Sequence, residues 1–262
     1  DSKRLDAIDG VDLEMMNHKN YMVTGASSGV GRALAIEISK RGGCVVLVAR
    51  REEELRETLK QMKNQEKHIC IPFDLTCFDE YRSLFAQIKA KGIVLDGLVH
   101  CAGIAPITPL RAISYKSMSR IFDIHYFAFM ELVKCYAKKG VSNGGSIVAV
   151  SSAVIEHPLK CMTVYASAKA AVEVACKNLA IELYDKSIRI NTVVLGGVNT
   201  EMVQNTDDVV TEIVVRRDDW SSVRHLMPIP EAKDVVGPIL FLLGEDARYI
   251  TGRKINVDGG ML

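Results

Sequence analysis

The feature that most limits how this chain can fold is the alternation of short apolar runs with longer amphipathic stretches. The amphipathic stretches include residues 32–41, 52–63 and 164–184, and they are expected to be helices. Strands that read as continuous hydrophobic runs belong to parallel sheets covered by helices on both faces. The pattern therefore predicts an α/β fold, a doubly wound Rossmann-like sheet of about seven parallel strands. The runs expected to form strands are residues 21–24, 44–49, 68–73, 95–102, 146–152, 188–195 and 254–258.

Composition and charge exclude several classes of protein. The chain has 262 residues, 48% of them hydrophobic, and 33 basic against 32 acidic side chains, so its formal net charge is +1. Disorder does not fit this composition, and a nucleic-acid binder normally carries a basic excess. No apolar run reaches the roughly 18 residues of a membrane span. The 7 cysteines include no CxxC pair, so we expect no metal site and reduced thiols in a cytoplasmic protein.

The chain shows no linker, composition shift or repeat that would divide it, so residues 1–262 are expected to form a single domain. One segment, residues 199–228, is too long and too polar for an ordinary connection. It is expected to be a substrate loop with some helix of its own.

A glycine-rich turn follows the first expected strand and opens the next helix, with the sequence Thr-Gly-Ala-Ser-Ser-Gly-Val-Gly at 24–31. Glycines there bring backbone N–H groups and a helix N-terminus against a pyrophosphate. A plain connection between strand and helix is the alternative reading. The residues expected to bind the phosphates are Gly25, Ser27, Ser28, Gly29, Val30 and Gly31.

The end of the second expected strand indicates which dinucleotide is bound. An acidic residue there suits the ribose hydroxyl of NAD, whereas an arginine suits the 2′-phosphate of NADP. The strand ends in Arg50 and Arg51, and the first acid, Glu52, comes later in the next helix. NADP(H) is therefore favoured, with Arg50 the better candidate and Arg51 the second. The alternative is that both arginines only face solvent.

Tyr165 and Lys169 are four residues apart in a helical stretch and therefore lie on one face of it. An ammonium beside a phenol stabilises the phenolate and lowers the pKa of the phenol toward neutrality. Ser152 ends a strand at the carboxyl edge of the expected sheet, where a hydroxyl can bind a substrate carbonyl. For Ser152, a turn or helix-capping role is the alternative.

Taken together, several motifs resemble the short-chain dehydrogenase/reductase family over residues 19–262. They are the glycine turn, Phe-Asp-Leu-Thr at 73–76, Cys-Ala-Gly at 101–103, a serine 13 residues before Tyr-Ala-Ser-Ala-Lys at 165–169, and Thr-Gly-Arg-Lys-Ile-Asn-Val-Asp-Gly-Gly at 251–260. The resemblance implies that Tyr165 is the general acid/base, that Lys169 lowers its pKa and holds the nicotinamide ribose, and that Ser152 orients the carbonyl. It places Asn191 before the strand end near the nicotinamide. It also implies cofactor contacts from Asp74, Leu75, Cys101, Ala102, Gly103, Tyr165, Lys169, Gly196, Val198 and Thr200.

The chain departs from the family pattern at three places. His100 and Cys101 replace two asparagines, His125 replaces the fourth catalytic residue, an asparagine, and Leu195 replaces a proline. His125 either anchors a proton-relay water, with a charge that varies near neutral pH, or only fills a helix face.

The expected activity is reduction of a ketone by NADPH. The overall length and ending resemble bacterial 3-oxoacyl-[acyl-carrier-protein] reductases. Lys138 and Lys139 are candidates for contacting an acidic carrier, and the alternative is that they are solvated lysines at the end of a helix. The arginine by which such enzymes hold the carrier is missing, because this chain has Ala180-Ile181-Glu182. A sugar, steroid or secondary-alcohol dehydrogenase and a non-catalytic dinucleotide-binding regulator are the alternatives. The resemblance also implies that the chain forms dimers or tetramers through the long helices before and after the fifth strand and through the C-terminal segment.

Overall fold

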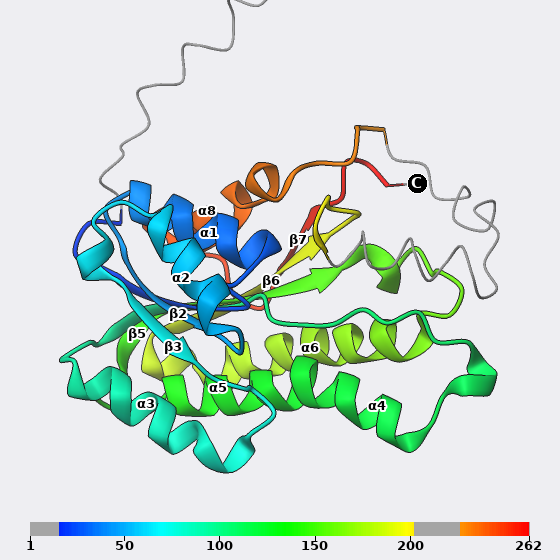
Figure 1. Cartoon of the computed structure of the whole chain (residues 1–262), viewed down its shortest axis with the longest axis horizontal. Helices are drawn as coiled ribbons and strands as arrows, with labels where there is room; N and C mark the ends of the chain where they lie inside the picture. Colours follow the sequence, from blue (N-terminus) through cyan, green and yellow to red (C-terminus); the bar gives the residue numbers. More distant parts are fainter. Residues whose placement is uncertain (1–15, 202–225, 262) are drawn as a thin grey trace, which may run out of the picture.

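The computed structural model describes residues 16–201 and 226–261, and these residues contain one sheet of seven parallel strands (Figure 1). The strand order is β3-β2-β1-β4-β5-β6-β7. All six strand pairs are parallel, so the predicted Rossmann-like α/β fold is confirmed. The strands are β1 (Asn20–Thr24), β2 (Cys44–Ala49), β3 (Ile69–Pro72), β4 (Leu95–His100), β5 (Ser142–Ser152), β6 (Ile188–Leu195) and β7 (Lys254–Val257).

Helices cover both faces of the sheet (Figure 1). One face carries α1 (Gly29–Lys40), α2 (Glu52–Lys60) and α8 (Gly237–Leu243). The other carries α3 (Tyr81–Ala90), α5 (Ala128–Tyr136) and α6 (Thr163–Glu182), with α4 (Tyr115–Phe122) beside α6. A π-helical turn, η4 (Asp123–Phe127), joins α4 to α5. Short 3-10 turns occupy Gln65–Lys67, Phe78–Glu80, Leu110–Ala112, Ala153–Ile155, Tyr184–Lys186, Ala232–Val235 and Glu245–Ala247.

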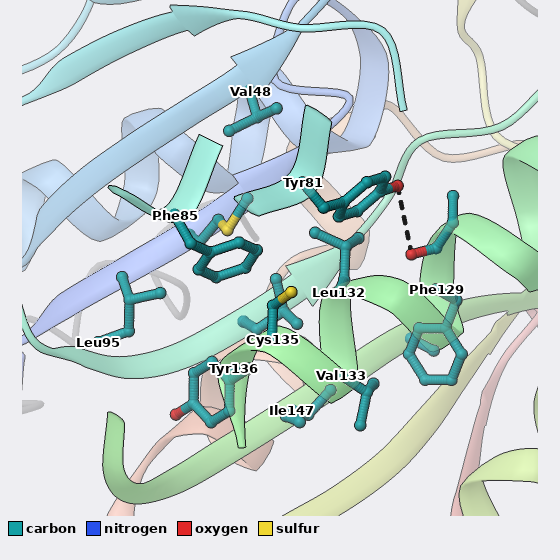
Figure 2. Packing of buried hydrophobic residues seen from close by; sticks show 14 of the residues in the cluster. Val48, Tyr81, Phe85, Leu95, Phe129, Leu132, Val133, Cys135, Tyr136 and Ile147 are labelled. Carbon is teal, nitrogen blue, oxygen red and sulfur yellow. Dashed lines mark hydrogen bonds between the residues drawn. The ribbon is translucent and has the colours of Figure 1, made fainter. Parts of the chain in front are cut away.

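The two helical layers explain why the strands read as continuous apolar runs. In β2, Val46 and Val48 join the core on one face, whereas Val45 and Leu47 join the core on the other. Successive side chains of a strand point to opposite faces, so a strand inside a sheet that is covered on both faces buries side chains on each face. Figure 2 shows part of the first of these cores, in which Phe85 of α3 and Leu132 and Phe129 of α5 pack in one cluster with strand residues such as Val48 and Ile147.

Several element boundaries differ from the predicted ones, among them the start of the first helix, which is at Gly29 and not at residue 32. The helix expected at 52–63 ends at Lys60, and the strand expected at 95–102 ends at His100. The fifth strand begins at Ser142 instead of 146, across Gly144 and Gly145, which both have positive φ. A pair of glycines reads locally as a turn, but pairing with β4 and β6 keeps the segment in the sheet.

One end of the predicted substrate loop lies beside the chain that follows β7, and the other lies beside the segment before α8. The Leu226 and Met227 N–H groups both donate to the Gly259 carbonyl at 3.1 Å, and the Asn199 N–H donates to the Pro230 carbonyl at 2.9 Å. Residues 202–225 of the loop lie outside the described residues. The single-domain assignment for 1–262 stays a prediction. In the two described ranges, no helix has the length and apolar character needed to cross a membrane.

Candidate active site

The carboxyl ends of the strands open onto a cleft of about 410 Å³. Its walls come from the segments after β1, β2, β3, β4, β5 and β6 and from one face of α6. Doubly wound sheets bind their ligands in this position. The predicted site residues that line the cleft are Gly25, Ser27, Ser28, Gly29, Val30, Gly31, Arg50, Arg51, Asp74, Leu75, Cys101, Ala102, Gly103, His125, Ser152, Tyr165, Lys169, Gly196, Val198 and Thr200.

The glycine turn has no room for side chains at two of its positions. Gly25 has a φ of +69°, and a Cβ there would lie 2.8 Å from the backbone nitrogen of Ala102. A Cβ on Gly31 would lie 2.3 Å from the Gly25 carbonyl oxygen. The turn is therefore packed directly against the end of β4, and α1 begins at Gly29 with its N-terminus at the cleft. The free N–H groups of a helix N-terminus favour an anionic ligand.

Arg32, which the sequence analysis did not single out, ties this turn to α2. Its guanidinium donates to the Ser27 carbonyl, to the Glu54 carboxylate at 2.6 Å and to the Thr58 hydroxyl at 3.0 Å. The Thr58 hydroxyl lies 2.8 Å from the Ala26 carbonyl, to which it donates. An arginine directly after the last glycine, with acids at the start of the next helix, was the signal available in the sequence.

The two arginines after β2 differ in their surroundings. Arg51 Nη2 lies 3.3 Å from Glu201 Oε2, and both side chains are about half exposed. Arg50 is exposed, and within residues 16–201 and 226–261 no carboxylate lies within ion-pair distance of it. Arg50 is therefore the cation whose charge is available at this end of the cleft.

Asp74 and Leu75, which follow β3, line the same cleft as these arginines. Asp74 Oδ1 accepts hydrogen bonds from the backbone N–H of Thr76 at 2.9 Å and from its hydroxyl at 2.8 Å. Leu75 is only 3% exposed. The Asp74 carboxylate is thus held by hydrogen bonds within its own turn, and Leu75 gives this part of the cleft wall an apolar surface.

Tyr165 and Lys169 lie one turn apart on the buried face of α6 and meet Ser152 from the end of β5. The Lys169 Nζ lies 5.8 Å from the centroid of the Tyr165 ring and donates to the Val150 carbonyl at 2.7 Å. Burial lowers the pKa of Lys169 to about 8, while Cys101 and Glu173 oppose that change. The ammonium therefore retains its charge at neutral pH, although it is almost fully buried.

The pKa of Tyr165 is raised, in the direction opposite to the predicted lowering. Burial is the main cause, and the hydrogen bond from the Ser152 hydroxyl opposes it. Desolvation disfavours a phenolate at this depth. The phenol is therefore protonated at neutral pH and able to donate a proton to a carbonyl oxygen.

His125 lies in the π-helical turn and is 1% exposed. Its Nε2 lies 2.8 Å from the Ile104 carbonyl oxygen and 3.1 Å from the Ile104 backbone nitrogen, so one tautomer donates and the other accepts. Its ring packs edge-on to Tyr165 at a centroid distance of 5.3 Å. Burial and the charge of Lys169 hold the pKa of His125 well below its usual range. The expectation that its charge varies near neutral pH is therefore wrong, because the imidazole is neutral there.

His100, the last residue of β4, is a second buried histidine next to the site. Its Nδ1 lies 3.0 Å from the Thr24 hydroxyl, which also accepts a hydrogen bond from the Ala102 N–H at 3.3 Å. Burial and the charge of Lys169 lower the pKa of His100 to about 3. In the sequence, the only signal was that a histidine stands at a position where the family has asparagine.

Two groups singled out in the sequence lie away from the cleft. Asn191 is fully buried within β6; its Nδ2 donates to the Ile250 carbonyl at 2.9 Å and its Oδ1 accepts from the Arg253 N–H at 3.0 Å. Lys138 and Lys139 are exposed just before β5 begins. At about 3.3 Å per strand residue, they are more than about 20 Å from Ser152. They therefore belong to the opposite edge of the sheet.

Comparisons with known proteins cover almost the whole chain. A family model described as "Enoyl-(Acyl carrier protein) reductase" matches residues 25–262. The D-erythrulose reductase of Gallus gallus is 31% identical over 255 residues, which are 93% of this chain and 96% of that protein. The 3-oxoacyl-[acyl-carrier-protein] reductase of Rickettsia bellii is 30% identical over 249 residues, which are 94% of this chain and 98% of that protein.

A solved structure agrees with the sequence comparisons. The structure of a short-chain type dehydrogenase/reductase from Mycobacterium ulcerans has a TM-score of 0.82 at 28% identity and covers 94% of this chain and 90% of that chain. The residues matched by the family model include the glycine turn and the helix that carries Tyr165 and Lys169. This chain therefore belongs to the short-chain dehydrogenase/reductase family and is an oxidoreductase of that type.

Proposed function

We propose that this protein uses NADP(H) to reduce a ketone to a secondary alcohol. The observation that carries the proposal is that Ser152, Tyr165 and Lys169 converge in the same cleft as the glycine turn. A proton donor, a hydroxyl that binds a carbonyl and a buried cation are the groups that this chemistry requires.

The residues of the cleft fit a nicotinamide dinucleotide, which short-chain dehydrogenases/reductases use. Gly25 and Gly31 admit no side chain, so backbone N–H groups and the start of α1 can approach a pyrophosphate closely. The preference for the 2′-phosphate rests on Arg50, which is exposed and faces no carboxylate among the described residues. Arg51, paired with Glu201, is the second contact.

When bound, the cofactor supplies the hydride that reduces the carbonyl carbon. Tyr165 donates its proton to the carbonyl oxygen, and the Ser152 hydroxyl hydrogen-bonds the same oxygen. Lys169 has three N–H donors, of which one is used by the Val150 carbonyl. The others are available to the ribose, and the positive charge stabilises the phenolate that Tyr165 becomes.

His125 has a positioning role in this scheme. It is neutral at working pH, hydrogen-bonded to Ile104 and packed against the Tyr165 ring. A Cβ on Gly103 would lie 2.2 Å from its Cε1, so the imidazole also fills the space beside the turn after β4. We assign it to holding this turn and the tyrosine ring, and not to carrying a proton.

The substrate end of the cleft favours a ketone flanked by apolar groups. Val154, Leu159 and Met162 line the cleft and pack in one apolar cluster with Tyr165. A polyol placed against them would leave hydroxyl groups without partners. A 3-oxoacyl thioester meets this requirement and is our first candidate. Lys138 and Lys139 give no support for docking of a carrier protein, since they lie at the far edge of the sheet.

A short hydroxyketone is the second candidate. It is favoured by the similarity to the D-erythrulose reductase of Gallus gallus over 93% of this chain.

The test is cofactor oxidation with NADPH and, in parallel, NADH, on acetoacetyl-coenzyme A and on erythrulose. We expect turnover of acetoacetyl-coenzyme A with a preference for NADPH of about tenfold or more, as a charge-assisted contact to phosphate provides. Faster turnover of erythrulose would favour the second candidate, and a preference for NADH would remove Arg50 from its role. Binding of NADPH with no turnover of any carbonyl would favour the non-catalytic regulator.

We also propose that the chain forms a dimer or tetramer through α5 and α6. Ala170, Ala171 and Val174 of α6 and Met130 of α5 line a shallow groove on the outer side of these helices. Val174 is 57% exposed and Ile181, two turns further along α6, is 80% exposed, so the outer side of this helix carries apolar side chains in contact with solvent. Light scattering should give a multiple of the 28.9 kDa chain mass, and Val174→Glu should give the single chain.

A further inference from the structure

Helix α6 carries a third ionisable side chain on the same face as Tyr165 and Lys169. Glu173 comes one turn after Lys169 and two turns after Tyr165, and residues four apart share a helix face. Glu173 is only 8% exposed and Lys169 is 5% exposed. The buried face of this helix therefore presents a phenol, an ammonium and a carboxylate in succession.

The Glu173 carboxylate is fixed by the strand that carries Ser152. The Ser151 hydroxyl, itself 2% exposed, donates to Glu173 Oε1 at 2.6 Å. No Lys, Arg or His of the two described ranges lies within 4 Å of this carboxylate. A carboxylate buried with one hydrogen bond is costly unless a positive charge lies nearby. Lys169 is the buried cation of the same helix face.

Among residues 16–201 and 226–261, the other titratable groups that act on Lys169 are uncharged at neutral pH. From β4 and the turn after it come His100, whose lowered pKa keeps it neutral, and Cys101, whose pKa is raised to about 12 by burial. His125 from the π-helical turn is neutral as well. Cys101 is therefore a neutral thiol at pH 7, and Glu173 is the carboxylate that acts on this lysine.

The groups that face Glu173 complete the electrostatic setting. Cys176, one turn further along α6, has its pKa raised by burial and by Glu173. Lys254 of β7 also feels the Glu173 charge, but its own ion pair is with Glu156. Lys254 is partly exposed, so its interaction with Glu173 is screened by solvent more than that of Lys169.

We propose that Glu173 is a positioning residue for the reaction: its carboxylate is the buried countercharge of the Lys169 ammonium, and through Ser151 it holds the end of β5 that carries Ser152. Burial alone disfavours the ammonium form, and a carboxylate in the same low-dielectric layer favours it. The inference rests on the proposed carbonyl reduction, in which a charged Lys169 and an ordered Ser152 are both required.

The test that needs no turnover is an NMR titration of the protein with ¹³C-labelled lysine, in which Lys169→Arg identifies the Lys169 signal. In Glu173→Gln the pKa of Lys169 should fall by about 0.5–1 relative to the wild type, because the opposite charge is gone while the shape is kept. Glu182→Gln removes an exposed acid from the end of the same helix and should leave the Lys169 titration unchanged. An unchanged titration in Glu173→Gln overturns the proposal.

Two further variants keep the test decisive. Glu173→Asp retains the charge and should restore most of the Lys169 titration, which a purely steric role of the side chain would not do. Glu173→Met fills the same space with an apolar side chain, a kind of replacement of a buried charge that proteins often tolerate. This variant is used if Glu173→Gln does not fold. In Glu173→Met the pKa of Lys169 should fall as in Glu173→Gln, and a wild-type value there contradicts the countercharge.

Kinetics separate this inference from the proposed function. If the enzyme reduces ketones, the loss of kcat/KM at high pH should begin about 0.5–1 pH unit lower in Glu173→Gln than in the wild type, while Glu182→Gln follows the wild type. If the wild type turns over no carbonyl, the proposed function fails, yet the titration still decides whether Glu173 acts on Lys169.

Discussion

The two ends of the cleft are built on different principles. At the glycine-turn end, the charged side chains Arg50, Arg51 and Glu201 are exposed, and the one ion pair among them is long and half in solvent. At the catalytic end, Lys169 and His125 are buried to 5% and 1% exposure, and burial shifts the pKa of each. Exposed charges are screened and act almost independently, whereas buried charges are coupled. Changes at the first end should alter selectivity, and changes at the second should alter chemistry and stability.

The largest effect is expected at the buried end, from Tyr165→Phe. Removing the proton donor should lower kcat by about 10³-fold, within the range of general acid catalysis. NADPH affinity, measured by fluorescence titration, should change less than about threefold, because the phenol hydroxyl contributes to chemistry more than to binding. If the variant kept its turnover, Tyr165 would not be the proton donor, and the buried end of the cleft would not differ from the exposed end in its effect on chemistry.

The second largest effect is the loss of folding stability at acid pH that is expected from the buried His100. His100 has a folded-state pKa of about 3, below its unfolded value, so the unfolded chain binds the proton and the folded chain does not. Stability is therefore full above about pH 6.5 and is lost as the pH falls toward 3. At pH 5 the loss attributable to His100 should be about 2 kcal/mol, from the linkage of protonation to unfolding.

Urea unfolding at pH 7 and pH 5 measures this loss, and His100→Asn should reduce the difference between the two pH values by about that amount. The amide of asparagine can still pair with the Thr24 hydroxyl, so the variant is expected to fold. An equal pH dependence in wild type and variant would mean that His100 is protonated in the folded protein.

A smaller and selective effect is expected at the exposed end. Arg50→Ala should weaken NADPH binding by about 10- to 50-fold, the value of a charge-assisted contact to phosphate, and leave NADH binding within about twofold. Isothermal titration with both cofactors at low and high salt measures it. If Arg50→Ala weakened the binding of NADPH and NADH equally, Arg50 would contact a part of the molecule that both cofactors have.

The smallest effect concerns the pairing of Arg51 with Glu201. Glu201→Gln should strengthen NADPH binding by about two- to threefold, since it frees Arg51 for the 2′-phosphate, and the gain should vanish in 0.5 M salt. The same titration measures it. Weaker NADPH binding in this variant would instead mean that Glu201 holds Arg51 in its working position.

Much of the fold was predictable because its signal is local. Each strand of a doubly covered sheet is a continuous apolar run, and all seven runs became strands within a few residues. The glycine turn was readable for a similar reason, since Gly25 and Gly31 are required by contacts that any side chain would break. The strand through Gly144 and Gly145 shows the limit, because pairing with its neighbours outweighed the local preference for a turn.

The candidate residues were predictable as a set, but their physical states were not. Sequence reasoning named His125 and expected a charge that changes near pH 7, whereas burial against Tyr165 and Ile104 keeps it neutral. It also expected a lowered pKa for Tyr165, and burial raises it. Both differences have one cause, the depth of the site, which no short motif records.

The amino-acid sequence by itself determined the sheet, the glycine turn, the arginines that follow β2 and the order of serine, tyrosine and lysine, because these depend on local geometry and on the spacing of apolar residues. Only the tertiary structure decided that Glu173 and Ser151 meet behind the site, that Arg32 joins the turn to α2, and that two histidines beside Lys169 are neutral. Burial and charge coupling arise between segments far apart in the chain, and packing brings those segments together.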